Sequence, residues 1–392
     1  MFSATSTTVY SASRLLPALR HFSNHSAGLR ITDLATPGYE KVIRVNHLPS
    51  GLDAVISIHS TALGPALGGL RIFDYPSFDA AVMDANRLSA GMSHKSALAG
   101  TGLGGGKSVI KVDSKNVTLE MLKAYAAALN ILNGSYIAAE DVGSTVRTLD
   151  FIGQYSHYVT GCSHSKSSGD PSPFTAWGVY RAMQATCEEL DGNSSLQGRT
   201  VAIQGLGNVG TKLAEFLFWG GAKLIVSDID LSRVSAMTKK FSAIPCSPER
   251  IHEQPCDIFA PCALGGILNP ETIPMLQCGA VTGAANNQLL SPADAGALQD
   301  RGIYYTPDFL ANAGGIINIG VGGEMSSDGY DPRLSLSVVH KIFDTTKEIF
   351  AKAKQSGTTT NKAAIDIAED RMEKGIGRRT EPVVFHHSNS WT

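Results

Sequence analysis

A glycine-rich turn between an apolar strand and a helix constrains the fold of this chain more than any other segment. Residues 200–204 are typical of a buried strand, and the turn Gly205-Leu206-Gly207-Asn208-Val209-Gly210 follows them directly. The pattern predicts a helix over 209–219 and a second strand over 223–227 that ends at Asp228. This order of strand, turn, helix, strand and acidic residue is typical of the βαβ unit of a doubly wound α/β sheet.

Each glycine of this turn has an expected part in binding a dinucleotide. Gly205 permits the tight turn, Gly207 lets the backbone approach a pyrophosphate, and Gly210 lets helix and strand pack closely. Asp228, which stands 18 residues after Gly210, is expected to bind a ribose 2′-hydroxyl and to repel a 2′-phosphate. We therefore expect NAD as the cofactor, held by the turn including Asn208 and Val209; the alternative is a βαβ unit without a cofactor.

Length and composition indicate a two-domain globular protein. The chain has 392 residues, 43% of them hydrophobic and 17% charged, and a formal net charge of −2, which gives no reason to expect nucleic acid or a membrane as partner. The six cysteines are scattered without a Cys-x-x-Cys pair, so no metal site and no disulfide framework is expected. The predicted division is 1–28 (transit peptide), 29–165 (substrate and oligomerisation domain), 166–335 (dinucleotide-binding domain), 336–375 (C-terminal helices) and 376–392 (mobile tail).

The first 28 residues differ in composition from the rest. They carry Arg14 and Arg20 among serines, threonines and leucines and contain no acidic residue, as in amphipathic transit peptides. This predicts a location in the mitochondrial matrix, with a plastid or the cytoplasm as alternatives. A polar leader without targeting function would have the same composition.

A pair of lysines suggests a catalytic site in the first domain. Lys95 follows Gly91-Met92-Ser93-His94, and Lys107 follows three glycines, Gly104 to Gly106. We expect the glycines to form a turn that leaves the Lys107 amine open to a small substrate. A second ammonium group at Lys95 and shielding from water would lower the pKa of Lys107 and let it act as a base. The alternative is a surface lysine beside a flexible turn.

Several sequence blocks together resemble the glutamate/leucine/phenylalanine/valine dehydrogenases, nearest the leucine/valine branch. They cover roughly residues 29–375 in one order. The blocks are Gly64-Pro65-Ala66-Leu67-Gly68-Gly69-Leu70-Arg71, Gly91-Met92-Ser93-His94-Lys95, Gly104-Gly105-Gly106-Lys107, Ala139-Glu140-Asp141-Val142-Gly143, Ser168-Gly169-Asp170-Pro171, Ala260-Pro261-Cys262-Ala263, Ala284-Ala285-Asn286-Asn287-Gln288 and Asn312-Ala313-Gly314-Gly315.

This resemblance implies the NAD-dependent oxidative deamination of an L-amino acid to a 2-oxo acid and ammonia. It implies that Lys95 binds the substrate carboxylate, that Lys107 is the general base, and that Asp141 moves protons at the substrate nitrogen. The remaining implied contacts are Gly68, Gly69, Met92 and Asn286 for the substrate and Thr175, Ala260, Asn286 and Asn312 for the cofactor. The alternative for Asp141 is a helix cap or turn carboxylate, and the alternative for the two asparagines is turn chemistry.

The resemblance also implies which residues surround the substrate's side chain. They are four apolar residues, Leu67, Ala139, Ile316 and Ile319. Hydrocarbon side chains offer no partner for a second carboxylate, so we expect an aliphatic substrate such as valine, leucine or isoleucine and not glutamate. The alternative is that these residues belong to the protein core.

The predicted architecture is two α/β domains separated by a cleft, with the lysines on the N-terminal domain and a Rossmann-type NAD site on the C-terminal one. The resemblance further implies a homo-oligomer. Three alternatives stay open, namely a phenylalanine or other L-amino-acid dehydrogenase of the same family, an NAD-binding regulatory protein without turnover, and a hydroxy-acid dehydrogenase. The last would need a histidine–acid pair near the cofactor, and no convincing pair is visible in the sequence.

Overall fold

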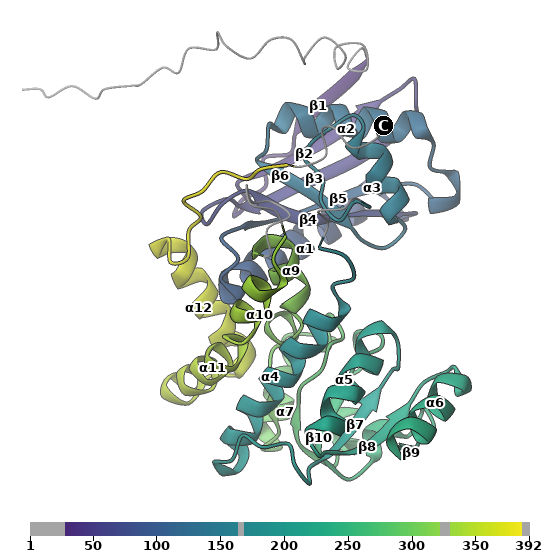
Figure 1. Cartoon of the computed structure of the whole chain (residues 1–392). Helices are drawn as coiled ribbons and strands as arrows, with labels where there is room; N and C mark the ends of the chain where they lie inside the picture. Colours follow the sequence, from purple (N-terminus) through teal and green to yellow (C-terminus); the bar gives the residue numbers. More distant parts are fainter. Residues whose placement is uncertain (1–27, 164–167, 322–329, 386–392) are drawn as a thin grey trace, which may run out of the picture.

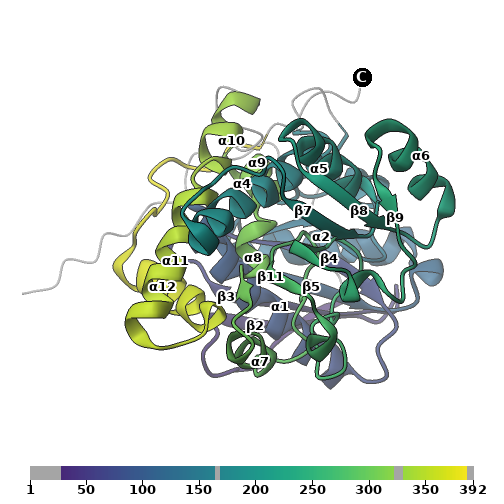
Figure 2. The same cartoon turned by 90° about the horizontal axis from the view of Figure 1, so that it is seen from below.

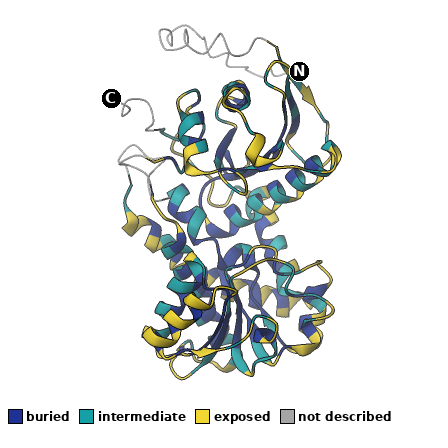
Figure 3. Ribbon diagram, turned by 90° about the vertical axis from the view of Figure 1, so that its right-hand side faces the viewer, coloured by how far each residue is buried: buried dark blue, intermediate teal, exposed yellow. Residues whose placement is uncertain are grey.

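The computed structural model describes residues 28–163, 168–321 and 330–385. It has two α/β lobes, each with its own sheet and its own buried residues (Figures 1 and 3). The predicted two-domain α/β fold is confirmed. The predicted transit peptide lies outside the described residues, apart from Gly28.

The first sheet is mixed and has the strand order β1-β2-β3-β5-β4-β6. Its strands are β1 (Leu29–Asp33), β2 (Lys41–His47), β3 (Leu52–Ser60), β4 (Ala66–Phe73), β5 (Gly104–Lys111) and β6 (Tyr136–Glu140). Strand β5 lies parallel to β4, and β4 lies parallel to β6, so these three strands carry their carboxyl ends to the same edge.

Helices cover both faces of this sheet. They are α1 (Phe78–Ala99), α2 (Leu119–Leu132) and α3 (Val146–Gly153). Helix α2 buries Leu122, Tyr125 and Leu129 against one face, and α1 buries Ala81 and Ala85 against the other. Helix α1 continues through Gly91 to Ala99, and this places Lys95 on a helix.

The second sheet is parallel, in the order β12-β11-β10-β7-β8-β9. Its strands are β7 (Thr200–Gln204), β8 (Lys223–Ser227), β9 (Ile244–Pro245), β10 (Cys256–Pro261), β11 (Cys278–Val281) and β12 (Tyr304–Tyr305). Strand β7 leads through the glycine-rich turn into α5 (Asn208–Trp219), and β8 ends beside Asp228, as predicted. Figure 2 shows this sheet from below.

The remaining helices surround the second sheet and connect it to the first domain. They are α4 (Ser172–Asp191), α6 (Leu231–Phe241), α7 (Asp294–Asp300), α8 (Asp308–Ala311), α9 (Gly314–Val321), α10 (Pro332–Val339), α11 (Ile342–Ser356) and α12 (Thr360–Lys374). Helix α12 packs against α1 of the first domain, and α11 packs against α4 of the second. Among the described helices, none is long and apolar enough to cross a bilayer.

The described part of the C-terminal tail is packed on the protein and is not mobile throughout, contrary to the prediction. The sequence predicts a mobile segment from residue 376, but residues 376–385 run back from α12 to the first domain and pack against it. Residues 386–392 lie outside the described part of the chain.

Candidate active site

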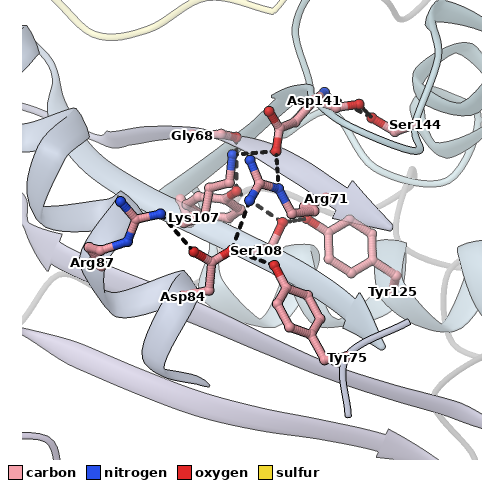
Figure 4. Close-up of polar contacts among 11 residues, drawn as sticks. Gly68, Arg71, Tyr75, Asp84, Arg87, Lys107, Ser108, Tyr125, Asp141 and Ser144 are labelled. Carbon is pink, nitrogen blue, oxygen red and sulfur yellow. Dashed lines mark hydrogen bonds and ion pairs between the residues drawn. The ribbon is translucent and has the colours of Figure 1, made fainter. Parts of the chain in front are cut away.

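The buried amine of Lys107 lies in a partly buried ion-pair network on the first sheet (Figure 4). Lys107 is 5% exposed, and its Nζ donates to Oδ2 of Asp141 at 2.6 Å. Arg71, on β4, donates from Nε to the same oxygen at 2.9 Å. One carboxylate oxygen therefore accepts hydrogen bonds from two cationic side chains.

The network continues on the far side of Arg71. Its Nη1 donates to Oδ2 of Asp84 on α1 at 2.8 Å, the hydroxyl of Tyr75 donates to the same oxygen, and Arg87 donates to Oδ1 at 3.0 Å. Sequence reasoning missed the role of these residues. The pleat of β4 would have placed Arg71 correctly, because residues two apart on a strand share a face and Arg71 stands two positions after Gly69.

Burial and charge act against each other on the central pair. Burial lowers the pKa of Lys107 most strongly; Asp141 opposes this shift, Arg71 adds to it, and the net direction is downward. Burial alone would raise the pKa of Asp141, but Lys107 and Arg71 outweigh it and hold that pKa below its usual value. Asp141 therefore stays ionised while the amine beside it loses its proton more easily than a surface lysine.

Asp141 is held by a turn and does not cap a helix. Its backbone NH donates to the Ser144 hydroxyl at 2.9 Å, and that hydroxyl donates to the Asp141 carbonyl at 3.0 Å. The residue that caps α3 is Thr145. The carboxylate of Asp141 is thus left to face Lys107 and Arg71.

Lys95 lies on α1, with Met92 one turn before it. Burial lowers the pKa of Lys95 to about 8, with Asp308 of the second domain raising it and Lys107 lowering it. This changes our expectation about the lysine pair. The neighbouring cation that lowers the pKa of Lys107 is Arg71, whereas between the two lysines it is Lys107 that lowers the pKa of Lys95.

The glycines before Lys107 serve packing and do not form a turn. They belong to β5 and are buried, contrary to our expectation of an open turn. A Cβ at Gly105 would lie 2.0 Å from the backbone nitrogen of Ser93 on α1, and one at Gly106 would lie 2.6 Å from the ring of Tyr136. Helix α1 and the ring of Tyr136 therefore lie directly against the backbone of β5.

The paired glycines of β4 leave room for the ion pair itself. A Cβ at Gly69 would lie 2.6 Å from Cβ of Asp141 and 3.1 Å from Nζ of Lys107. A Cβ at Gly68 would lie 1.8 Å from the carbonyl oxygen of Gly106. Gly69 thus faces the amine, and Gly68 faces the neighbouring strand.

Three of the four expected side-chain-binding residues lie together. Leu67, Ala139 and Ile319 belong to one apolar cluster with Leu103 and Ile137. Ile316, the fourth, packs instead against the core of the second domain.

A cavity of about 590 Å³ opens at the carboxyl ends of β7 and β8. Gly205, Gly207 and Asp228 line it, and Oδ2 of Asp228 accepts from the Leu206 backbone NH at 2.6 Å. The hydroxyl of Ser227, also in the lining, is buried and lacks a hydrogen-bond partner among the described residues. The third glycine of the motif, Gly210, lies where a Cβ would come within 2.0 Å of the Gly205 carbonyl oxygen.

Of the other expected cofactor residues, two belong to this turn, one lies on α4, and one is buried away from the cavity. Asn208 and Val209 form the first turn of α5. Thr175 lies in the first turn of α4, and its hydroxyl would be 3.0 Å from a Cβ at Gly315. The side chain of Ala260 is buried in the core of the second domain, and Cys262 and Ala263 line the cavity in its place.

The two expected asparagines contact each other. Nδ2 of Asn312 donates to Oδ1 of Asn286 at 2.7 Å and to the carbonyl oxygen of Ala284 at 3.1 Å. Oδ1 of Asn312 is buried and has no partner within the described part of the chain. This oxygen and the Ser227 hydroxyl are the kind of buried polar atoms that a bound dinucleotide would satisfy, so the residues present fit NAD.

The geometry defines a class of protein, a two-domain α/β enzyme with a buried lysine on one domain and a dinucleotide cavity on the other. Family models give the narrower assignment: the Glu/Leu/Phe/Val dehydrogenase dimerisation domain matches residues 40–157, and the Glutamate/Leucine/Phenylalanine/Valine dehydrogenase domain matches residues 168–374. The chain therefore belongs to the Glu/Leu/Phe/Val dehydrogenase family. It is an amino-acid dehydrogenase that uses NAD.

Curated relatives cover most of the chain. A leucine dehydrogenase of Geobacillus stearothermophilus is 46% identical over 87% of this chain and 92% of its own length. An L-tryptophan dehydrogenase of Nostoc punctiforme is 43% identical over 88% of this chain and 97% of its own. A valine dehydrogenase of Streptomyces albus is 43% identical over 87% and 94%.

Solved structures agree with the fold. A crystal structure of L-tryptophan dehydrogenase from Nostoc punctiforme superposes with a TM-score of 0.79 at 41% identity, covering 86% of this chain and 97% of that one. A hetero-hexameric glutamate dehydrogenase from Thermus thermophilus, at 21% identity, has a TM-score of 0.68 and covers 90% of each chain. The second match supports the fold alone.

The predicted location in the mitochondrial matrix is contradicted. The relatives named above are bacterial proteins, and none of the matches gives a positive sign of a targeting peptide. The basic, serine-rich composition of the leader misled the prediction, since a polar leader without an address has the same composition.

Proposed function

We propose that this enzyme catalyses the reversible, NAD-dependent oxidative deamination of a branched-chain L-amino acid, valine, leucine or isoleucine, to its 2-oxo acid. The observation that carries the proposal is the Lys107–Asp141 pair, 2.6 Å between Nζ and Oδ2, in which the lysine is buried and the carboxylate partly buried, on the same sheet as an apolar cluster. Ammonium, NADH and a proton are the other products, and one water is consumed.

Each polar residue has a separate role in this proposal. Lys95, in its charged form, binds the substrate carboxylate. Asp141 accepts a proton from the substrate's ammonium group, and Lys107 accepts a proton from the water that attacks the imine carbon. NAD, bound by the Gly205–Gly210 turn and Asp228, supplies the hydride acceptor.

A lowered pKa of Lys107 suits the charge that develops on the substrate. Oxidation of an amine to an iminium places positive charge beside the reacting carbon, so a protonated Lys107 would oppose it. The burial of Lys107 and the charge of Arg71 both favour the neutral amine. Water leaving this site on domain closure would strengthen both effects.

The aliphatic preference is supported by the side chains in the cluster. Leu67, Ala139 and Ile319 offer hydrocarbon surface and no hydrogen-bonding group. A second carboxylate on the substrate would therefore be buried without a partner. The tryptophan dehydrogenase relative supports the competing proposal of an aromatic substrate.

A substrate panel tests the proposal. Initial rates would be measured from the absorbance of the NADH formed with L-valine, L-leucine, L-isoleucine, L-phenylalanine, L-tryptophan and L-glutamate. We expect kcat/KM to be highest for a branched-chain substrate and lowest for glutamate. A maximum at tryptophan or phenylalanine would reject the branched-chain assignment and favour the aromatic one.

We also propose that the enzyme is a homo-oligomer that associates through the first domain. The match of residues 40–157 to a dimerisation domain supports this. Light scattering of the purified chain gives the subunit number directly.

A further inference from the structure

The C-terminal segment returns to the first domain after the last helix. Helix α12 ends at Lys374, and Gly375 and Gly377, with φ of 66° and 80°, turn the chain away from the helix axis. In Figure 1 the segment is the yellow trace that leaves α12 and runs to the sheet near β6. It joins the end of the second domain to the edge strand of the first.

Arg379 anchors this segment to both domains. Its backbone NH donates to the Leu63 carbonyl at 2.8 Å; its side chain donates from Nη2 to the Gly320 carbonyl at 2.7 Å and from Nε to the Gly102 carbonyl at 3.3 Å. Gly64 and Gly102 leave room for it, because an added Cβ at either would lie within 3.4 Å of Cβ of Arg379. The anchor therefore depends on features of both domains.

Beyond the anchor, Val383 and Phe385 pack on the apolar cluster of the site. They contact the cluster built on Leu67, Leu103 and Ile137, to which Ala139 and Ile319 also belong. The ring of Phe385 lies 5.5 Å from that of Tyr158, edge to face at 89°. Val384, between them, is not part of this cluster.

The same cluster lies beside the reacting groups. Leu67 stands two residues before Gly69 on β4, whose missing side chain faces Lys107, and Ala139 stands two residues before Asp141. Residues two apart on a strand share a face and lie about 7 Å apart. This spacing puts the cluster next to the Lys107–Asp141 pair on one face of the sheet.

We propose that residues 380–385 form the far wall of the substrate's side-chain pocket, and that Phe385, with Val383, sets the longest side chain that the enzyme accepts. The proposal rests on the proposed function, since it assigns the cluster to the substrate. The specificity of this site would then depend on a segment that lies beyond both matched family domains, the second of which ends at residue 374.

Substitution of Phe385 tests the wall. In Phe385→Ala we expect the kcat/KM ratio of L-phenylalanine to L-valine to rise about tenfold or more, because several carbon atoms of the wall are removed. The kcat/KM for 2-aminobutyrate should stay within about threefold of wild type, because that short side chain does not reach the wall. Val384→Ala is the matched control and should leave the ratio unchanged.

A merely structural tail gives a different result. If Phe385→Ala lowers kcat/KM for all amino acids in parallel and leaves their ratio unchanged, the proposal is overturned. Arg379→Ala, compared with the exposed neighbour Arg378→Ala, should broaden the substrate range in the same direction as Phe385→Ala, and an unchanged range there would also count against the wall. The wild-type substrate panel tests the proposed function separately, and the variant-to-wild-type ratio tests the wall whichever amino acid the wild type prefers.

Discussion

Lys107 has its special environment because of the residues on the strands beside it. Gly69 on β4 leaves space next to the amine, Asp141 accepts its hydrogen bond, and Arg71 keeps that carboxylate ionised. Lys95 lies on α1, and burial lowers its pKa, with a further contribution from the charge of Lys107. In the proposed mechanism the two lysines have opposite requirements, because Lys107 would act as a base without its proton and Lys95 would bind a carboxylate with its own.

The pKa of Lys95, about 8, predicts how carboxylate binding changes with pH. The side chain is charged below this pH and neutral above it, so affinity for a carboxylate should be full below about pH 8 and fall about tenfold per unit above it. The probe is 4-methylpentanoate, which has no titrating amine, and the measurement is its inhibition constant from about pH 7 to about pH 10.

Lys95→Arg serves as the control, because a guanidinium stays charged over this range. It should bind 4-methylpentanoate with little dependence on pH. An inhibition constant for the wild type that stays flat across the range would show that Lys95 does not bind the carboxylate.

At the scale of elements, contact between α1 and β5 decides where the proposed catalytic groups lie. The helix lies against a strand that begins with three glycines, and Ser93 on α1 touches the backbone at Gly105. This close packing brings Lys95 and Lys107, one from each element, to the same site. A side chain on β5 at that point would push the helix away.

Substitution of Gly105 by alanine should therefore destabilise the protein. Its Cβ would lie 2.0 Å from the backbone nitrogen of Ser93, so we expect a loss of about 1–3 kcal/mol or more and a lower Tm. Gly91→Ala, on α1 with nothing within 4 Å of the added Cβ, should raise stability by about 0.5–1 kcal/mol. If Gly105→Ala melts at the wild-type temperature, helix packing does not explain this glycine.

At the scale of the whole molecule, the proposed function divides the reaction between the two domains. The first domain supplies Lys95, Lys107 and Asp141, and the second supplies the cavity beside Asp228. Contacts also cross the boundary, such as the packing of α12 on α1 and the hydrogen bond from Arg87 to Asn287 at 3.5 Å. Choice of cofactor and choice of amino acid should therefore be separable by mutation.

We expect Asp228→Ser to lower the ratio of kcat/KM for NAD to that for NADP by about tenfold or more. The carboxylate that repels a 2′-phosphate is removed, and Arg233, with Nη1 3.8 Å from Oδ2 of Asp228, remains nearby as a cation. The ranking of amino acids should not change. Leu67→Ala is the reciprocal control and should alter that ranking while leaving the cofactor ratio as it was. If either variant changes both the cofactor ratio and the amino-acid ranking, the two choices are not separable by mutation.

The sequence predicts the second domain better than the details of the first. The sequence predicts correctly that the Gly205–Gly210 turn connects a strand to a helix and that Asp228 follows the next strand. These positions depend on contiguous residues of one βαβ unit. The environment of Lys107 depends instead on side chains far apart in the chain, such as Arg71 and Asp84, which only tertiary contacts bring together. The packing of Phe385 on the first domain could not be read from the polar composition of the tail for the same reason.

Turnover of Lys107→Ala with and without methylamine tests the central claim most directly. We predict that kcat falls by about 100- to 10,000-fold, and that methylamine restores activity in proportion to the concentration of its unprotonated form. Lys111→Ala, at the end of the same strand, should keep the wild-type rate. Near-normal turnover of Lys107→Ala without added amine would contradict the assignment of Lys107 as the base.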